Sequence, residues 1–431
     1  MKVSKILTIL AISLFFASTL LVRIQFGSYS FFHIGIVIIL ALLMFFPEVG
    51  GLKSFLKIDT IVAYQLVFLL VVLVSYLVNI PNADSVSKIY SSNSGESPSF
   101  LYWKIMLNGL IFVLSTIVAY LLGRTICSSK ANFLKVYNAV IIFCLINAFV
   151  NVVAWLIATG GVIGRYNFEP PITFSPGMSI QYSSIGFLLG LGALAAVNLQ
   201  YRRKMVIVAL AILLFSILII LTRQSQVSFL IMWMWYFYKT KKMPVKTLLW
   251  VVPLAIIVML GGITILYLAG ALDSYGGIDS TESTDVAIRL LMLNSAYELF
   301  INQPLFGIGY GMFVGHNTVP IVITGVPTYL ASPHNGVASI LCELGMAGIV
   351  MIFLITTIVI RKMNESLKKI KDVVLYKYCC GIYVVQVIFM LSVFVSNSNL
   401  YGPPSEVPYL YISFISWFMI GSVIGIKNAK L

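Results

Sequence analysis

Long apolar runs follow one another along most of the chain's 431 residues. Twelve of these runs approach the roughly 20 apolar residues that a helix needs to cross a bilayer. They cover residues 6–22, 29–46, 60–80, 101–123, 136–158, 180–200, 205–222, 224–238, 248–269, 335–360, 373–395 and 408–426. Charged residues make up only 10% of the chain, whereas a soluble domain carries about 25%. The sequence therefore excludes a water-soluble or nucleic-acid-binding domain and predicts an all-α polytopic membrane protein, a single integral membrane domain over residues 1–431.

The seventh and eighth runs lie in one stretch of 34 residues between Lys204 and Lys239, interrupted only at residues 222–225. A continuous helix of that length would be about 50 Å long, too long for a hydrocarbon core of about 30 Å. We therefore expect two short spans joined by a tight turn at Arg223.

The basic residues fix the predicted orientation. When the N-terminus is placed inside, 22 of the 28 Lys and Arg residues fall on cytoplasmic segments, as the positive-inside rule requires. About 12 spans with both termini cytoplasmic follow from this alternation. The first run lacks a small-residue cleavage site, so we expect a retained helix and not a signal peptide. The outer side holds the remaining six basic residues: Arg23, Lys88, Lys104, Arg165, Arg223 and Arg289.

The predicted external loops hold most of the functional candidates. One covers residues 159–179, and a larger one covers residues 270–333 between spans 9 and 10. A loop that long is usually functional. Within it, the capping side chains of residues 283–285 predict a surface helix over residues 286–301 that stops before Pro304. The glycines of residues 307–311 lack the spacing of a phosphate-binding loop and predict a tight turn.

The tenth span begins with Ser332, Pro333, His334 and Asn335. Serine favours the N-cap and proline the first helical position, which would put His334 and Asn335 in the first turn at the outer boundary. Exposed amides there favour a bound phosphate and a neutral imidazole that can act as a base. An interfacial histidine with a satisfied hydrogen bond is the alternative.

Three residues further along this span have predicted structural roles. Glu343 lies about half-way round the helix from His334 and roughly 13 Å deeper, which favours packing or hydrogen bonding over direct partnership. Gly345 and Gly348 are three residues apart, which would let another helix approach closely.

Arg165, Arg223 and Arg289 lie on the predicted outer side together with His334. Arginine stays charged and binds phosphate oxygens in a bidentate manner. For any single arginine, an exposed loop position or a lipid headgroup contact is the alternative. The external acidic residues show no metal-ligand spacing, so we expect no metal-dependent mechanism and no cofactor.

The tenth span, His334-Asn335 followed after nine residues by Gly345 and Gly348, resembles the signature of bacterial O-antigen ligases and related Wzy-type polysaccharide polymerases. Further similar elements are the Arg-x-x-x-Leu of residues 289–293, the segment 304–309, the Thr-Arg pair at 222–223 and, more loosely, Arg165 with Gly177. The resemblance is sharpest over residues 160–350.

This resemblance implies a GT-C-like glycosyltransferase of the cytoplasmic (inner) membrane whose active site faces the periplasm or exterior. It would polymerise undecaprenyl-pyrophosphate-linked repeat units of O-antigen, capsule or exopolysaccharide. The alternative is a ligase that transfers the glycan to lipid A-core. His334 would act as general base, and Arg223 and Arg289 would bind the pyrophosphate. Asn335 would orient His334 or the acceptor, and Arg165 would hold the sugar or phosphate.

Two other classes are disfavoured. A lipid-linked oligosaccharide flippase needs polar residues along a pathway through the bilayer, and Glu343 is nearly the only clear one. A membrane scaffold has no use for His334 in its motif. The expected partners are the lipid-linked glycan and membrane lipid. A flippase and a chain-length regulator stay open as protein partners, and we expect no nucleic acid.

Overall fold

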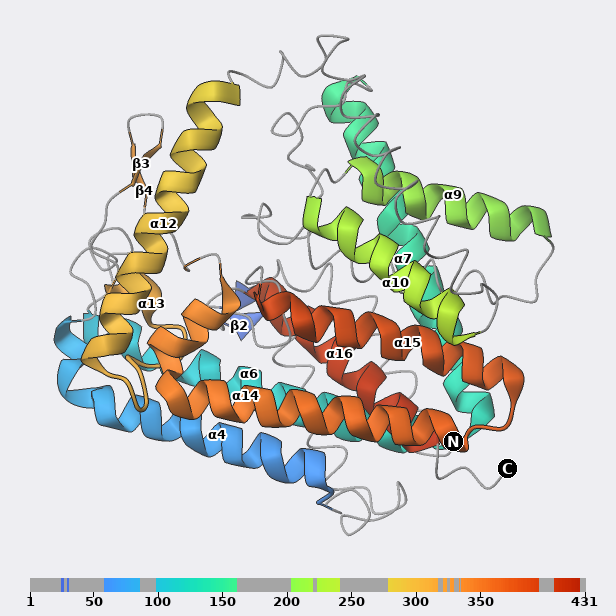
Figure 1. Cartoon of the computed structure of the whole chain (residues 1–431), viewed down its shortest axis with the longest axis horizontal. Coiled ribbons are helices and arrows are strands. Elements are labelled where there is room, and N and C mark those ends of the chain that lie inside the picture. The colour runs from blue at the N-terminus through green and yellow to red at the C-terminus, as the bar shows by residue number, and fades with distance from the viewer. Residues whose placement is uncertain are drawn as a thin grey trace. The chain divides into compact units, whose positions relative to one another are not determined.

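The computed structural model describes residues 25–26, 29–30, 58–85, 98–160, 203–219, 223–240, 278–316, 321–323, 326–328, 333, 335–394 and 407–426. These residues are helical apart from turns and two short antiparallel hairpins (Figure 1). The hairpins pair β1 (Gln25–Phe26) with β2 (Tyr29–Ser30), and β3 (Ile321–Ile323) with β4 (Val326–Thr328). The helices are α4 (Thr60–Asn79), η2 (Ile80–Ser85), α6 (Pro98–Ile126), α7 (Lys130–Thr159), α9 (Arg203–Ile219), α10 (Arg223–Lys239), α12 (Ile278–Asn302), α13 (Phe313–His316), α14 (Gly336–Lys369), α15 (Val373–Leu391), η4 (Ser392–Phe394) and α16 (Val407–Ile426).

Eight of the predicted spans correspond to described helices: α4, α6, α7, α9, α10, α14, α15 and α16. The stretch between Lys204 and Lys239 forms two helices, since α9 ends at Ile219 and α10 begins at Arg223. The other predicted spans, 6–22, 29–46, 180–200 and 248–269, lie outside the described residues except for 29–30, which form β2. The total number of spans and the positions of the termini therefore stay predictions.

Four described helical segments are long and apolar enough to cross a membrane by length and composition. They are Thr60–Asn82, Phe100–Ile126, Gly336–Lys369 and Val373–Phe394, and Ser413–Ile426 is a shorter apolar helix. Several such helices in one chain support a multi-pass membrane protein.

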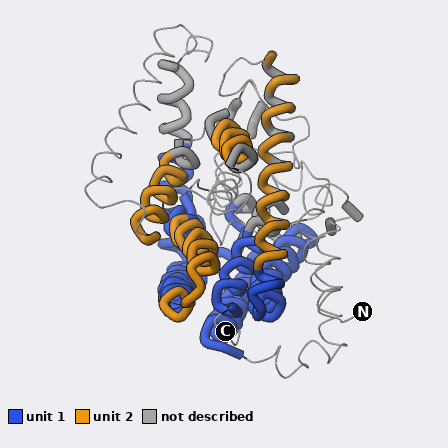
Figure 2. The backbone as a smooth tube through the Cα atoms, turned by 90° about the vertical axis from the view of Figure 1, so that its right-hand side faces the viewer, with its two compact units in different colours: residues 1–133, 286–366, 389–431 blue, residues 134–285, 367–388 orange. Residues whose placement is uncertain are grey.

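The chain divides into two compact units (Figure 2). Unit 1 contains Met1–Phe133, Val286–Ser366 and Phe389–Leu431, and unit 2 contains Leu134–Asp285 and Leu367–Ile388. Within unit 2, aromatic pairs join α7 and α10 to α15. The ring centroids of Tyr137 and Tyr378 lie 4.4 Å apart, and those of Trp235 and Tyr383 lie 5.7 Å apart.

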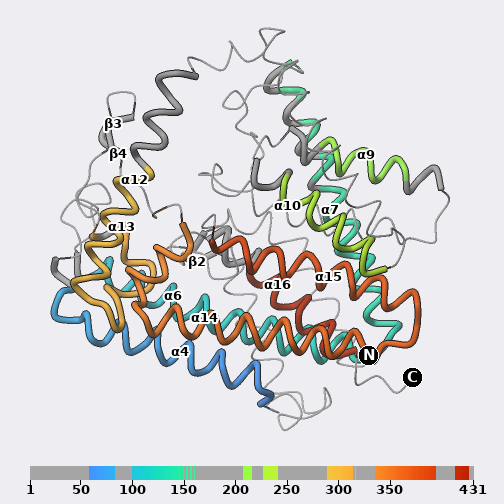
Figure 3. The backbone as a smooth tube through the Cα atoms, viewed as in Figure 1, coloured from blue at the N-terminus to red at the C-terminus, as the bar shows by residue number. Residues whose placement is uncertain are grey.

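The core of unit 1 contains α6 and α16 in close contact (Figure 3). A Cβ atom on Gly421 would lie 2.1 Å from the Tyr120 carbonyl oxygen, and one on Gly425 would lie 2.3 Å from that of Arg124. The two helices therefore run parallel, because residue numbers rise together along both. Glycines at such positions let helix backbones approach more closely than larger residues allow.

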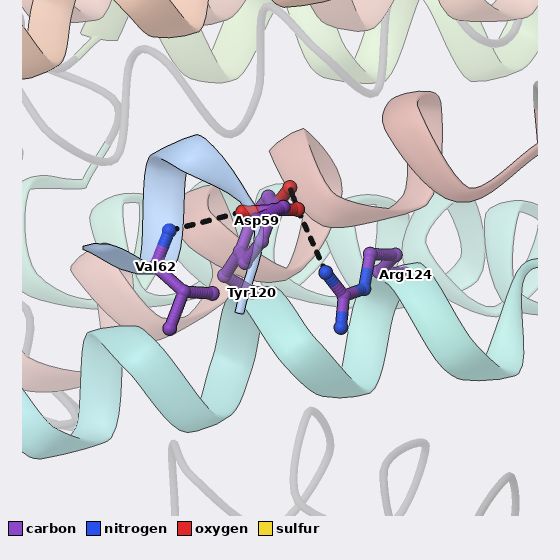
Figure 4. A network of polar contacts seen from close by, with 4 residues as sticks. All are labelled: Asp59, Val62, Tyr120 and Arg124. Carbon is purple, nitrogen blue, oxygen red and sulfur yellow. Dashed lines mark hydrogen bonds and ion pairs between the residues drawn. The ribbon is translucent and has the colours of Figure 1, made fainter. Parts of the chain in front are cut away.

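Helix α4 is joined to α6 by a polar network at its first turn (Figure 4). One oxygen of Asp59 caps α4 by accepting a hydrogen bond from the Val62 amide at 3.0 Å. Its other oxygen accepts from the Tyr120 hydroxyl at 2.5 Å and from the Arg124 guanidinium at 2.7 Å. The single carboxylate thus caps the start of α4 and fixes this helix to α6.

Candidate functional site

A helix is present over the predicted residues 286–301 as part of α12, which ends at Asn302 before Pro304, as expected; its place at the membrane surface stays a prediction. The helix begins earlier than predicted, at Ile278, so residues 283–285 lie inside it and do not cap it. The stretch 278–285 contains no proline or glycine to stop a helix, and it directly follows the glycine pair 276–277. Acidic residues near this start also favour it electrostatically.

A small hydrophobic cluster joins α12 to α13 and α14. Met292 and Ala296 of α12 are buried with Phe313 of α13 and Cys342 of α14. Leu299 and Ala338 pack against this cluster and are partly buried. The structure therefore packs the helix that carries Arg289 against the first turns of α14.

Arg289 lies one turn before Met292 and is exposed. Asn335 lies just before the start of α14, three residues before Ala338. The same hydrophobic cluster thus fixes the two segments that carry Arg289 and Asn335.

The start of α14 differs from the prediction. The helix begins at Gly336, and Asn335 caps it by accepting a hydrogen bond from the Ala338 amide at 3.0 Å. The side-chain amide of Asn335 also donates to the Phe394 carbonyl at 3.2 Å. Ser332 is therefore not the N-cap, and Pro333 is not the first helical residue. Asparagine is as good an N-cap as serine, and the bond from its side chain to Phe394 adds a contact beyond the cap itself.

His334 lies outside the described residues, and it immediately precedes the cap instead of lying in the first turn. Its neighbours in sequence, Pro333 and Asn335, are buried and half-buried respectively. Its role as a base stays a prediction.

Helix α14 is broken at Gly345, which has φ 63° and ψ −159° (Figure 1). The loop of residues 303–312, which connects α12 to α13, runs along this break. Four backbone hydrogen bonds join the two segments: Ile308 N to Cys342 O at 2.9 Å, Gly309 N to Glu343 O at 3.0 Å, Met346 N to Pro304 O at 2.8 Å and Ala347 N to Leu305 O at 3.1 Å. The loop thereby satisfies backbone groups that an interrupted membrane helix would otherwise leave unpaired.

Both glycines of the motif lie near this break: Gly345 forms it, and Gly348 follows within one turn of α14. A Cβ atom on Gly345 would lie 2.5 Å from the carbonyl carbon and oxygen of Leu305, so the segment that approaches is a loop and not the expected second helix. A Cβ atom on Gly348 would lie 2.2 Å from Cβ of Leu344 on the same helix. Gly345 is also needed for its positive φ, which other residues rarely adopt.

Glu343 is buried, with 2% of its surface exposed. Its carboxylate accepts a hydrogen bond from the Phe313 amide at 3.3 Å, and the backbone amide of Gly311 also interacts with it. The carboxylate therefore contacts the main chain at the end of the 303–312 loop.

Polar side chains in the last turns of α4 hold the same loop. The Ser75 hydroxyl donates to the Phe306 carbonyl at 2.6 Å, and the Asn79 amide donates to the Gly307 carbonyl at 2.8 Å. The Tyr76 hydroxyl donates to the carbonyl of Tyr310 at 2.5 Å. Sequence reasoning missed these residues, although three polar side chains at the end of an apolar span were a usable signal.

A second imidazole lies at the end of α13. His316 Nδ1 is 3.1 Å from the Met312 carbonyl oxygen, so Nδ1 carries the proton when this bond is formed. Burial lowers the pKa of His316 below its ordinary value and favours the neutral ring. His316 is therefore a useful comparison for His334.

Two of the three predicted arginines have no described side chain. Arg165 lies outside the described residues, and Arg223 is the first residue of α10 with a side chain outside the described part. Only Arg289 has a described side chain. The convergence of these arginines with His334 stays a prediction.

Residues 208–353 match the O-antigen ligase family. This match confirms the resemblance that the motifs indicate. It begins within α9 and ends within α14, so it includes Arg223, Arg289, His334 and the break at Gly345, whereas Arg165 precedes it. No curated protein matches the chain. The family and the apolar helices together support a membrane-bound enzymatic role in O-antigen ligation or polymerisation.

Proposed function

We propose that the protein is a glycosyltransferase that polymerises undecaprenyl-pyrophosphate-linked oligosaccharide repeat units at the outer face of the cytoplasmic membrane. The observation that carries this proposal is the family match over residues 208–353, which includes both Arg289 and His334. The packing of α12 on the start of α14 supports it, because this packing joins the segments that carry these two residues.

In the proposed reaction, His334 takes the proton from an acceptor hydroxyl, whose oxygen attacks the anomeric carbon of the donor glycan. The bond from that carbon to the pyrophosphate oxygen breaks, and undecaprenyl pyrophosphate leaves. Arg289 and Arg223 bind the pyrophosphate and stabilise its charge as it leaves. Arg165 holds the sugar or a phosphate. Asn335, through its cap and its bond to Phe394, holds the backbone beside His334.

The proposed reaction needs no metal or other cofactor. Pyrophosphate is already a good leaving group, and guanidinium groups can supply the positive charge that a cation supplies elsewhere. A flippase that delivers the lipid-linked repeat unit and a chain-length regulator are the proposed protein partners.

A ligase is the second candidate, because the matching family is described by that activity. A ligase uses the same donor and the same leaving group but transfers the glycan to lipid A-core. The residues proposed above would keep their roles, and only the acceptor would differ.

Deletion of the gene followed by gel display of surface glycans tests the proposal. A polymerase predicts single-repeat products, whereas a ligase predicts long chains that remain on undecaprenyl pyrophosphate. Unchanged glycans would refute both.

Complementation with His334→Ala should restore no long glycan although the protein accumulates in the membrane. His316→Ala is the control, since it removes the other imidazole of the same region. Normal glycan with His334→Ala would eliminate the base role.

A further inference from the structure

Glu343 is a buried ionisable residue in the membrane-spanning helix α14, and the proposed reaction gives it no role. A buried carboxylate in such a segment is costly unless polar partners stabilise it. Its side chain contacts the backbone amide of Phe313, the first residue of α13, at 3.3 Å. It also interacts with the Gly311 amide. These partners lie 30 and 32 residues earlier in the chain, so the carboxylate connects segments distant in sequence.

These contacts link Glu343 to the Arg289 segment. Phe313 belongs to the same buried cluster as Met292, which lies one turn after Arg289 on α12. A shift of Phe313 would therefore be transmitted to the helix that carries Arg289, because packed interiors transmit strain.

Glu343 is also connected to the His334 segment. It lies in the short first part of α14, whose cap is Asn335, and its neighbour Cys342 belongs to the same hydrophobic cluster as Phe313. The backbone of this part pairs with the 303–312 loop through the Cys342 and Glu343 carbonyls. The carboxylate thus fixes the loop to the helix segment that begins beside His334.

We propose that Glu343 is a positioning residue: its carboxylate holds the 303–312 loop and α13 against the break in α14, and it thereby fixes the Arg289 segment relative to the His334 segment. Glu343 itself contacts no substrate in this proposal. The inference rests on the proposed function, because it takes Arg289 as the pyrophosphate ligand and His334 as the base. It adds a reason for a buried carboxyl group that the reaction does not use.

Helix α4 provides a second hold on the same loop. Tyr76 is fully buried, and its hydroxyl donates to the Tyr310 carbonyl. Tyr76→Phe keeps the ring and removes the bond to the Tyr310 carbonyl, so it loosens the loop while the Glu343 carboxylate keeps its hydrogen bond to the Phe313 amide.

The test compares Glu343→Ala, Glu343→Gln and Tyr76→Phe with the wild-type full-length protein in lipid nanodiscs. Hydrogen exchange of peptides covering residues 303–312 measures how firmly the loop is held. Steady-state glycan transfer from a lipid-linked repeat unit gives kcat and KM for the donor. Glu298→Gln is the matched control, since Glu298 is an exposed carboxylate on α12 whose partner is the Asn294 amide at 2.8 Å.

We expect Glu343→Ala to speed exchange in the loop and to lower kcat by about 10- to 100-fold, because small misplacements of reacting groups cost that much. KM for the donor should change by less than about 3-fold, because the pyrophosphate ligands remain. Glu343→Gln keeps an acceptor oxygen and should retain most of both properties. Tyr76→Phe should also speed loop exchange and lower kcat, but by less than Glu343→Ala does. The Glu298→Gln control should match the wild type.

Four results would overturn the inference: unchanged loop exchange in Glu343→Ala, faster exchange with unchanged kcat, a loss confined to KM, or a Glu343→Gln variant that behaves like Glu343→Ala. If Glu343→Ala does not accumulate, Tyr76→Phe tests whether a looser loop lowers kcat, and faster exchange with unchanged kcat in that variant would overturn the inference. Full transfer activity of His334→Ala would instead refute the proposed mechanism, while the exchange experiment would still report on the loop.

Discussion

Replacement of Gly345 by alanine should be among the most damaging small changes in the described part of the chain. Its φ of 63° and ψ of −159° lie in a region essentially restricted to glycine, and the backbone strain for another residue is about 1–3 kcal/mol. The added Cβ would also lie 2.5 Å from Leu305 backbone atoms and 2.6 Å from the Pro304 carbonyl oxygen. Overpacking of this kind costs about 1–3 kcal/mol, so the total loss should be about 2–6 kcal/mol.

Gly160→Ala provides the matched control. Gly160 has φ 61°, and a Cβ atom there would meet nothing within 4 Å. It should therefore lose only the backbone contribution, about 1–2 kcal/mol. The unfolding free energies can be compared by detergent-induced denaturation in mixed micelles, followed by tryptophan fluorescence. If the two variants lost the same stability, the close approach of the 303–312 loop to Gly345 would be refuted.

Three further predictions concern Arg289, the proposed independence from metal ions and the Asp59 cap of α4. Arg289→Lys should lower transfer at least about 10-fold, because an ammonium cannot make the bidentate contact; full activity would remove the pyrophosphate clamp. Chelator treatment should leave the purified enzyme active, and a loss that magnesium restores would overturn the metal-free proposal. Asp59→Ala should lower the unfolding free energy by about 2–3 kcal/mol, since it removes a helix cap and leaves the largely buried Arg124 without its carboxylate. Asp59→Asn retains the capping oxygen and should lose less in the same assay.

The helices could be predicted from sequence because a membrane span needs only length and apolarity, both of which are local. The two short helices between Lys204 and Lys239 are an example, since arithmetic on helix length alone required a break. The break in α14 could not be predicted this way. Residues 336–360 are apolar apart from Ser339, Glu343, Thr356 and Thr357, and nothing in them predicts a break; the partner that satisfies the broken backbone lies about 40 residues earlier, in the 303–312 loop.

The first residue of α14 could not be predicted from the local sequence either. Ser332-Pro333 and Asn335 are both acceptable beginnings by capping preference. In the structure Asn335 is the cap, and its side chain also donates to the carbonyl of Phe394, 59 residues later in the chain. The residue types of the candidate site were thus predictable, whereas the hydrogen bonds that orient them were not.

Helix α4 has no residue in the sequence motif, yet it bears on the site. Its first turn is fixed to α6 by Asp59, and its last turns hold the 303–312 loop through Ser75 and Asn79. Near this end, the Tyr102 hydroxyl of α6 also donates to the carbonyl of Tyr76 at 2.5 Å. Because α4 is fixed to α6 near both ends, the position of the loop depends on α6 as well as on α14. Variants at Asp59 should therefore change loop exchange at residues 303–312, far along α4 from the substitution, if the helix acts as a rigid connection.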